Sequence, residues 1–462
     1  MESKSTLINI LRQKDSLTEN LAVTNSTSLN GLVDLFFVAG ACRTMDVNNI
    51  ESLLARSWAE DSLLTMKLIF WAGNIRGGAG ERRFFRLALS WLEKNYEDSL
   101  KKNLHLIPFF NRWDSLFCLK FENVCDLIKK GLDEKNGLCG KWMPRKNQYN
   151  NFAGKFRSYF KLTPKQYRQL IVSLSKTVEQ KMCSKKWNEI IYSHVPSVAM
   201  NKYRKSFFRN DEERFKLFID KVVKGEEKIH ADVLFPYQLY QAMERDEDKS
   251  AIEAQWYALP NYMKDSKERI LPVCDVSGSM TGLPMAISIS LGLYLSERNI
   301  GIFKDAFVTF SHSPTIQYLK GSVVERMHQL NQADWDMNTD LNAVFELLLR
   351  RANEEKLIPN DMPTMLLIIS DMEFDECGQL TNFENIKQKY FESGYICPKI
   401  VFWNVDARKG NNIPTKFNEQ GVALVSGATP AVMKGILNAK FITPVDILLQ
   451  TLNDEIYKEI VV

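Results

Sequence analysis

Three short segments in the C-terminal half of the chain are rich in carboxylate and hydroxyl side chains. Asp275-Val276-Ser277-Gly278-Ser279 directly follows one apolar run, and Ser370-Asp371 directly follows another. Thr339 lies between them in the chain, just before a segment with a helical pattern. Because the carboxyl ends of parallel strands meet at one edge of a sheet, we expect the first and last segments at the same edge, with Thr339 entering through a loop.

These side chains are hard oxygen ligands. Carboxylates and hydroxyls without His or Cys suit Mg²⁺ or Mn²⁺, which take near-octahedral oxygen coordination. The alternation lets Asp275, Ser277 and Ser279 point inward from one turn, and Gly278 is expected to allow the tight path. The sequence therefore predicts a divalent-cation site. The alternative is an ordinary turn, because an isolated Asp-x-Ser-x-Ser loop also has a common turn composition.

The constellation resembles the metal-ion-dependent adhesion site of von Willebrand factor A domains. Such sites hold a divalent ion on two Ser residues and one Thr or Asp, and a carboxylate from a partner protein usually fills an open position. The resemblance implies that Mg²⁺ or Mn²⁺ is held by Asp275, Ser277, Ser279, Thr339 and Asp371. We expect no enzyme. A phosphatase of the haloacid-dehalogenase type would need a second Asp where Ser277 stands, and the sequence suggests no His partner for either serine.

The surrounding sequence alternates between strand and helix patterns. Short apolar runs predict strands at 270–274, 306–310, 365–369, 400–403 and 422–425. Expected helices lie at 284–295, 341–349, 383–391 and 443–457. Strands that alternate with helices of this length indicate a doubly wound, mostly parallel sheet. We therefore expect residues 269–462 to form a von Willebrand A-like domain with a closing C-terminal helix.

The residues before 270 predict helix after helix and few strands. Apolar side chains recur at i, i+3, i+4 and i+7, for example from Phe84 to Leu92. Thr163-Pro164 predicts a helix start, with Thr as the N-cap and Pro at the first helical position. The chain is thus expected to be multidomain, α plus α/β. Residues 31–268 would form an α-solenoid of HEAT-like repeats, whose closure into a ring stays open, after a flexible lead-in at 1–30.

The sequence also resembles larger families. Residues 71–82 (WAGNIRGGAGER) resemble a glycine turn of Ro/TROVE RNA-binding proteins, which join a ring of helical repeats to a von Willebrand A domain. A closer resemblance is to an uncharacterised family of plants and large DNA viruses, through 111–114 (NRWD), 141–144 (KWMP), 194–200 (HVPSVAM), 370–375 (SDMEFD) and 401–404 (VFWN). The glycines themselves predict a tight turn between helices, because a phosphate-binding P-loop would need Gly-Lys-Ser/Thr where Glu81-Arg82 stands.

Charge is divided unevenly along the chain. The net charge of +4 hides 44 Lys and Arg against 33 Asp and Glu in residues 1–270, and 16 against 23 in residues 271–462. Residues 141–209 alone hold 16 basic side chains and two acids, Glu179 and Glu189. Such asymmetry suggests different partners for the two halves.

Residues 141–209 also interleave cations with aromatic rings, a pattern typical of contact with single-stranded or structured RNA. The likeliest contact loop by composition is 141–154, and the candidate RNA-binding residues are Lys141, Arg145, Lys146, Lys155, Arg157, Lys161, Lys165, Arg168, Lys185, Lys186, Lys202, Arg204 and Lys205. The alternative is that rings such as Phe156, Tyr159 and Phe160, at helical spacing, belong to the core and that the lysines are simply solvated.

Two functions follow from these observations. The first is a non-enzymatic, Ro-like RNA-binding scaffold whose metal site engages a partner carboxylate. The second is a protein-interaction adaptor whose helical array binds an acidic protein, without nucleic acid.

Composition excludes other classes. No apolar run reaches the roughly 18 residues that a spanning helix needs, and the N-terminus lacks the apolar segment of a secretory signal. The eight cysteines are scattered without a Cys-x-x-Cys pair, which argues against a disulfide framework or a zinc site and fits a reducing, cytoplasmic setting.

Overall fold

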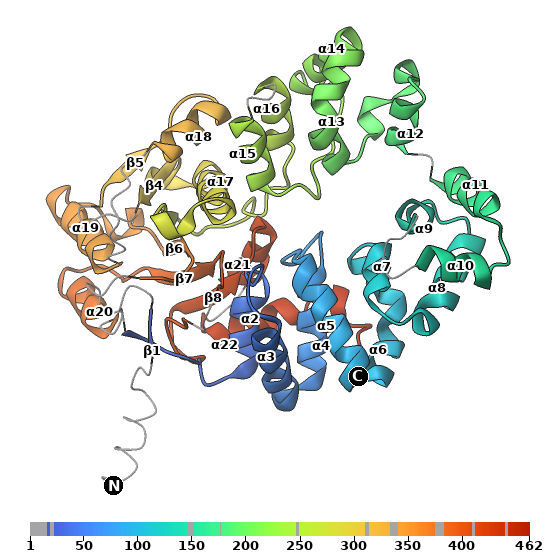
Figure 1. Cartoon of the computed structure of the whole chain (residues 1–462). Coiled ribbons are helices and arrows are strands. Elements are labelled where there is room, and N and C mark those ends of the chain that lie inside the picture. The colour runs from blue at the N-terminus through green and yellow to red at the C-terminus, as the bar shows by residue number, and fades with distance from the viewer. Residues whose placement is uncertain are drawn as a thin grey trace. The chain divides into compact units, whose positions relative to one another are not determined.

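A computed structural model describes residues 16–18, 23–145, 152–175, 177–245, 249–309, 314–332, 341–374, 383–408, 412–438 and 442–462 (Figure 1). The chain divides into two compact units. The α/β unit contains Met1–Asp61 and Asn261–Asn453, and the helical unit contains Ser62–Pro260 and Asp454–Val462. Each unit thus combines segments that are far apart in the sequence.

The α/β unit is built on a six-stranded sheet with the order β5-β4-β3-β6-β7-β8. Its strands are β3 (Ile270–Cys274), β4 (Ala306–Thr309), β5 (Ile316–Tyr318), β6 (Met365–Ser370), β7 (Lys399–Asn404) and β8 (Val422–Ser426). All pairings are parallel except that between β4 and β5, so the sheet is mixed. Every residue of the central strands β3 and β6 is buried, which explains their unbroken apolar runs.

The predicted strands and most of the predicted helices of this unit are present. The helices are α17 (Leu283–Glu297), α18 (Val323–Asn331), α19 (Leu341–Glu354), α20 (Phe383–Glu392), α21 (Met433–Asn438) and α22 (Pro444–Leu452). Helix α17 packs on β3, β4 and β6 and is buried almost all round, as its apolar sequence requires. Strand β5 was not predicted, because this edge strand is half-exposed and carries no apolar run.

Two N-terminal helices lie in the α/β unit, although their sequence pattern predicts that they belong to the helical repeats. They are α2 (Gly31–Ala39) and α3 (Val47–Glu60). Helix α2 is wholly buried and packs on β8, where the Ser426 hydroxyl donates to the carbonyl of Phe36 at 2.7 Å and the amide of Gly40 donates to Ser426 Oγ at 3.0 Å. A helix that is apolar all round must be buried, but its sequence does not say against which partner.

The described part of the expected flexible lead-in is held in place, so that prediction is wrong for residues 24–28. Asn25 pairs with Ile413, with amide-to-carbonyl distances of 3.2 and 3.0 Å. Thr24 and Ser28 are buried as well. Short strands β1 (Ser16–Leu17) and β2 (Val23–Thr24) pair in antiparallel fashion before this bridge. A Ser/Thr/Asn-rich composition reads as a loop, yet these side chains supply hydrogen bonds to the α/β unit.

The described residues of the helical unit form helices and no strand. They include α4 (Ser62–Gly73), α5 (Arg82–Asn95), α6 (Glu97–Asn103), α7 (Ile107–Phe110), α8 (Phe121–Asp133), α9 (Gly137–Trp142), α10 (Phe152–Tyr159), α11 (Pro164–Leu174), α12 (Val178–Cys183), α13 (Ser197–Asn210), α14 (Glu212–Val223), α15 (Pro236–Glu244) and α16 (Lys249–Tyr257), with short 3₁₀ turns η2 (Trp113–Cys118), η3 (Trp187–Glu189) and η4 (Tyr192–His194). This confirms a helical region before the mixed sheet.

Local sequence signals in this unit are confirmed. Thr163 caps α11 in a capping box: Gln166 N donates to Thr163 Oγ1 at 3.3 Å, and Thr163 N donates to Gln166 Oε1 at 2.9 Å. The glycine turn joins α4 to α5. A methyl group at Gly78 would lie 1.9 Å from the carbonyl oxygen of Trp71, so this turn is tight enough to require glycine.

The closing helix is shorter than expected. It was predicted to run from 443 to 457, but α22 ends at Leu452 and the residues from Asp454 onward pack in the helical unit. There the ring of Tyr457 stacks on Phe110 with centroids 5.4 Å apart, and its hydroxyl accepts a hydrogen bond from Asn74 at 3.1 Å. No described helix combines the length and apolar character that a membrane crossing requires.

Candidate functional site

The register of two neighbouring strands brings the predicted metal residues together. β3 and β6 are parallel, with Cys274 opposite Ile369. The amide of Asp275 continues the ladder by donating to the carbonyl of Ile369 at 3.0 Å. Asp275 and Asp371 therefore leave adjacent strands at the same edge, where they are 0% and 5% exposed. The prediction that strand ends would juxtapose these carboxylates is consistent with this register.

The loop after β3 folds back on its own carboxylate. Ser277 N donates to Asp275 Oδ1 at 2.9 Å, and the hydroxyl oxygens of Ser277 and Ser279 lie 3.1 Å apart. The Ser370 hydroxyl donates to the other oxygen of Asp275 at 2.6 Å. Gly278 does not have the role expected of it, since a methyl group there would meet nothing within 4 Å. The positive φ of 92° in this loop belongs to Gly282.

Asp371 has an oxygen without a partner. Its Oδ1 accepts from Glu373 N at 3.2 Å, whereas Oδ2 is buried and has no hydrogen-bond partner among the described residues. Burial first, and the neighbouring charge of Asp275 second, raise the pKa of Asp371 to about 7, although the Ser279 hydroxyl and the Glu373 amide act in the opposite direction. A buried carboxylate beside a second carboxylate is an unfavourable arrangement that a cation would relieve.

Four of the five predicted ligands therefore belong to one edge of the sheet, and Thr339 lies outside the described residues. The described part of the chain contains no cluster of three or more His, Cys, Asp or Glu side chains suited to a metal. A cation here would depend on serine hydroxyls as well as on the two carboxylates, the oxygen-only donor set that Mg²⁺ or Mn²⁺ accepts.

The sequence did not reveal a contact to the serine loop from the loop that follows a third strand. Arg408 follows β7, donates from Nε to Asp406 Oδ2 at 2.5 Å and also donates to the backbone carbonyl of Ser279. This contact ties the serine loop to the β7 edge. The only signal was an arginine a few residues after the VFWN strand, which by itself is not specific.

The candidate RNA-binding residues of the helical unit differ in exposure. Lys141 and Arg157 are half-buried, Lys146 lies outside the described residues, and the exposed ones are Arg145, Lys155, Lys161, Lys165, Arg168, Lys185, Lys186, Lys202 and Lys205. Arg204 is only 1% exposed, so its assignment to an RNA-binding surface is wrong. It lies four residues after Met200 and three before Phe207, on the buried face of α13.

Several of the aromatic rings in this region belong to the core, although Tyr159 is exposed. Phe152, Phe156, Tyr167 and Phe207 are buried, which favours the alternative reading of the ring pattern. The expected contact loop also differs from its prediction. Lys141 and Trp142 end helix α9, Met143 and Pro144 are buried, and residues 146–151 lie outside the described part.

A basic hollow does remain between α8 and α10. Its volume is about 990 Å³, and its lining includes Lys155, Arg157, Tyr159 and Lys161. Tyr159 is 40% exposed and donates its hydroxyl to Asp126 at 2.5 Å. Three cations and one exposed ring thus border a space large enough for a nucleotide.

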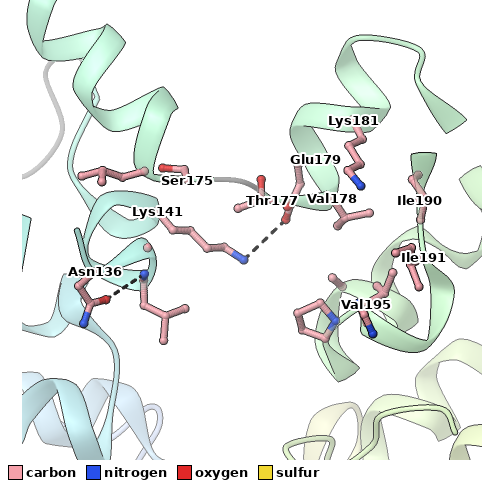
Figure 2. Close-up of a pocket in the computed structure, with 16 residues that line it drawn as sticks. Asn136, Lys141, Ser175, Thr177, Val178, Glu179, Lys181, Ile190, Ile191 and Val195 are labelled. Atoms are coloured by element: carbon pink, nitrogen blue, oxygen red, sulfur yellow. Dashed lines mark hydrogen bonds and ion pairs between the residues drawn. The ribbon is translucent and has the colours of Figure 1, made fainter. Parts of the chain in front are cut away.

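A second recess in this unit was not predicted. It lies between α9 and the end of α11 on one side and α12, η4 and the residues that flank η4 on the other, with a volume of about 590 Å³ (Figure 2). Lys141 and Glu179 extend toward each other across it, with Nζ and Oε1 3.9 Å apart. Apolar residues separated by long stretches of sequence line it, so no local pattern could have revealed it.

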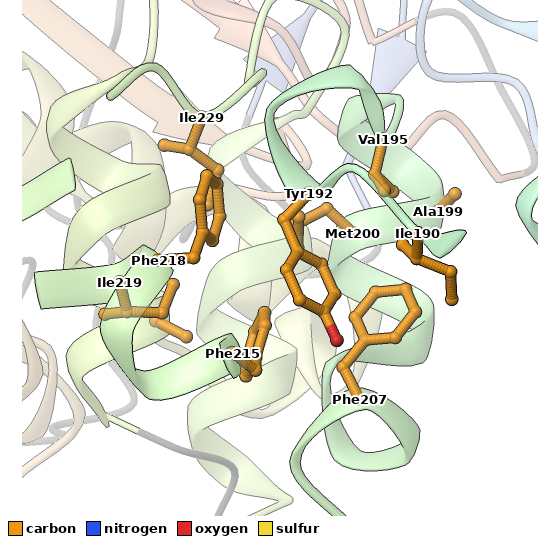
Figure 3. Close-up of a cluster of buried hydrophobic side chains, with 11 residues drawn as sticks. Ile190, Tyr192, Val195, Ala199, Met200, Phe207, Phe215, Phe218, Ile219 and Ile229 are labelled. Carbon is orange, nitrogen blue, oxygen red and sulfur yellow. The ribbon is translucent and has the colours of Figure 1, made fainter. Parts of the chain in front are cut away.

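One wall of this recess is anchored in a buried cluster (Figure 3). Ile190, Val195 and Ala199 belong both to the recess and to the cluster. Behind them the ring of Tyr192 packs on Phe207 and Phe215, with centroids 5.2 and 5.1 Å away. The wall is thus held by a core and is pre-formed.

Three arginines surround one buried carboxylate at a different place in the helical unit. Asp114 accepts from Arg112 Nε at 2.8 Å and from Arg86 at 2.8 Å, and Arg82 lies 3.4 Å away. Burial alone would raise the pKa of Asp114, but the hydrogen bond and charge of Arg112, with the charges of Arg86 and Arg82, lower it overall. The Arg112 guanidinium also stacks 3.7 Å from the ring centre of Trp142.

Comparison with known proteins places the chain in a family. The family described as "Domain of unknown function (DUF7788)" matches residues 269–456, and that described as "Domain of unknown function (DUF2828)" matches residues 18–112 and 120–268. Among curated proteins, the chain is 28% identical to "Uncharacterized protein L728" of Acanthamoeba polyphaga mimivirus, over 95% of this chain and 87% of the relative. A relative in a large DNA virus agrees with the expected distribution. The DUF2828 model matches more than half of the sequence, and the chain therefore belongs to the DUF2828 family.

Proposed function

We propose that the protein is a non-enzymatic binding scaffold whose α/β unit is a von Willebrand A-type domain that holds Mg²⁺ or Mn²⁺ and docks a carboxylate of a partner protein. The observation that carries this proposal is the buried Oδ2 of Asp371, which lacks a hydrogen-bond partner among the described residues while Asp275 lies beside it. A bound cation would neutralise this buried oxygen and offset the repulsion between the two carboxylates.

The residues that would hold the ion are Asp275, Ser277, Ser279 and Asp371, with Thr339 as the fifth predicted ligand. When bound, a divalent ion supplies positive charge for a partner carboxylate. The chain's own residues prepare the site in advance. Ser370 and the amide of Ser277 fix the carboxylate of Asp275, and Arg408 holds the serine loop through the carbonyl of Ser279.

Titration calorimetry of the EDTA-treated full chain with Mg²⁺ and with Mn²⁺ tests the site. We expect saturable binding that is lost in Asp371→Ala and retained in Asp265→Ala, which removes an exposed loop carboxylate of the same unit. Equal binding by Asp371→Ala and the wild type would refute the site.

RNA binding by the helical unit is a second candidate, and the hollow between α8 and α10 favours it. Lys155 and Lys161 are exposed there, Arg157 is half-exposed, and Tyr159 offers a ring edge. Cations that meet phosphates release counterions, so such binding is strongly salt-dependent. In this proposal the helical unit is an α-solenoid of HEAT-like repeats with a TROVE-like role, and an acidic protein partner is the alternative ligand.

A mobility shift with a uridine 20-mer at two salt concentrations tests this second candidate. Lys155→Glu combined with Lys161→Glu should weaken binding about tenfold or more at low salt, because two attractive charges become repulsive. Lys224→Glu, a charge reversal just after α14, is the matched control. No shift at low salt, or the same loss in both variants, would argue against a specific RNA surface at the hollow.

A further inference from the structure

We propose that the recess between α9, α11, α12 and η4 binds a short acidic peptide segment that carries aliphatic side chains, supplied by a partner protein. This site is separate from the metal site and from the basic hollow. The inference rests on the alternative named above, an acidic protein partner of the helical unit, and does not rest on the metal site. The recess is referred to below as the peptide groove, and its lining includes Leu138, Lys141, Glu179, Lys181 and Ile191.

The apolar part of the groove is unusually exposed. Leu138 on α9 is 57% exposed, and Ile191, between η3 and η4 on the opposite wall, is 56% exposed. Half-buried Leu174 and Val178 continue the apolar lining. Aliphatic side chains on facing walls of one recess are a favourable surface for apolar side chains of a ligand.

The charged groups at the groove select an acidic ligand. Lys141 and Lys181 lie in the lining, and Glu179 is the only Asp or Glu among the lining residues. Lys181 Nζ donates to the backbone carbonyl of Glu189 at 2.5 Å, which leaves its positive charge without a carboxylate in that contact. Lys141 Nζ is 3.9 Å from Glu179 Oε1, beyond hydrogen-bond distance, so its donors can serve an incoming carboxylate. The lysines lie within a sequence segment that holds 16 basic residues and two acids. Charge complementarity therefore favours Asp or Glu in the bound segment.

Glu179 favours a peptide over a nucleic acid. Its Oε1 accepts from the Tyr203 hydroxyl at 3.4 Å and lies 3.9 Å from Lys141 Nζ, whereas Oε2 is buried. The carboxylate therefore acts on a ligand in the groove mainly through its charge. A nucleic acid carries a negative charge at every nucleotide and would meet this carboxylate, whereas a peptide has an uncharged backbone and can place its acidic side chain beside Lys141, away from Glu179. An apolar floor is likewise a poor surface for a phosphate backbone. The combination of aliphatic walls, lysines and one carboxylate matches an acidic, aliphatic peptide.

The rigid wall supports specific recognition. Ile190, Val195 and Ala199 are fixed by the cluster of Tyr192, Phe207 and Phe215, so this side of the groove is not expected to reorganise on binding (Figure 3). A pre-formed wall lowers the entropic cost of association.

Panning a random dodecapeptide library displayed on phage against the full chain tests the proposal. The selection is done in EDTA, so that the metal site contributes nothing and a failure here is distinguishable from a failure there. We expect enriched peptides that combine Asp or Glu with Leu, Ile, Val or Met. An absence of enrichment, or enriched peptides without acidic residues, would overturn the proposal.

The best enriched peptide, labelled with fluorescein, is then measured by fluorescence anisotropy. Ile191→Ser and Leu138→Ser should each weaken binding about tenfold, since each removes apolar surface that the peptide would cover. Leu217→Ser on α14 is the matched control, because Leu217 is also 56% exposed but lies outside the groove. Equal affinity for Ile191→Ser and the wild type would overturn the assignment. A uridine 20-mer that binds the wild type and fails to bind Ile191→Ser would assign the groove to RNA and overturn it too.

Discussion

The hydroxyl of Ser370, the last residue of β6, donates to Oδ2 of Asp275, the first residue after β3, at 2.6 Å. Both residues are fully buried. The bond links two adjacent parallel strands just where they leave the sheet, and it fixes the Asp275 carboxylate beside Asp371. Ser370 thus holds the carboxylate of Asp275 in place, while the next residue in the chain, Asp371, presents the second carboxylate.

Replacing Ser370 with Ala should destabilise the α/β unit by about 2 kcal/mol, because a hydrogen bond to a buried charged group is lost. Urea unfolding of the full chain in EDTA measures this loss. The matched control is Ser184→Ala, which removes an exposed hydroxyl that bonds only within its own helix turn. A loss as small as that of the control would mean that Asp275 does not depend on Ser370.

Replacing Asp371 with Asn should affect stability in opposite directions with and without metal. In EDTA the variant should be more stable by about 1 kcal/mol, or a few degrees in Tm, because a neutral side chain replaces a buried carboxylate next to Asp275. With Mg²⁺ the Tm of the wild type should rise, because an ion that binds the folded protein stabilises it. The Tm of the variant should not rise, because it lacks the carboxylate that binds the ion.

Differential scanning calorimetry at pH 8 with EDTA or with millimolar Mg²⁺ distinguishes these outcomes. A variant that is less stable than the wild type in EDTA would show that Asp371 has a structural role of its own, and equal Mg²⁺ gains in both proteins would locate the ion elsewhere.

Sequence patterns predicted the sheet well because its central strands are buried on both faces. The unbroken apolar runs 270–274 and 365–369 predict buried strands. The polar residues directly after each run mark where the strand ends. Partners in space were harder to predict. Helix α2 packs on a sheet whose strands begin more than 200 residues later, and the segment around Tyr457 leaves the unit that contains the preceding helix α22. A local pattern reports burial rather than the surface that covers a residue.

The candidate sites show the same limit. Asp275 and Asp371 could be predicted because strand ends carry a positional rule, whereas Arg408 reaches Ser279 from a loop after a third strand. Arg204 was misassigned by charge alone, although its spacing from Met200 and Phe207 already indicated the buried face of α13. The peptide groove depends on Leu138 and Ile191, whose proximity only the tertiary structure reveals.

Replacing Gly292 with Ala should destabilise the support beneath the metal site. A methyl group there would lie 2.2 Å from Cys274 Sγ, so α17 could not keep its close approach to β3. Overpacking of this kind costs about 1–3 kcal/mol. Cys274→Ala removes the sulfur and leaves a small cavity, but in combination with Gly292→Ala it makes room for the new methyl group.

The double variant should therefore lose less stability than the sum of the two single losses, as urea unfolding of all four proteins would show. Additive losses would mean that Gly292 is needed for something other than the Cys274 contact.

Replacing Asp114 with Asn should destabilise the helical unit and flatten its response to acid. The folded-state pKa of Asp114 is lowered, so its contribution to stability is present above the unfolded-state pKa of about 3.9 and is lost as pH falls through the lower folded-state value. Asn cannot neutralise Arg82, Arg86 and Arg112. Because these arginines are partly exposed, the expected loss at pH 7 is roughly 2 kcal/mol, below that of a fully buried pair. Urea unfolding at pH 7 and pH 3 measures both effects, and the difference between wild type and variant should shrink at the lower pH.

Asp133→Asn is the matched control, since its exposed partner Lys129 lies four residues away on the same helix and the pair contributes little. A loss in Asp114→Asn that is the same at both pH values would show that the carboxylate's charge does not hold the three arginines together.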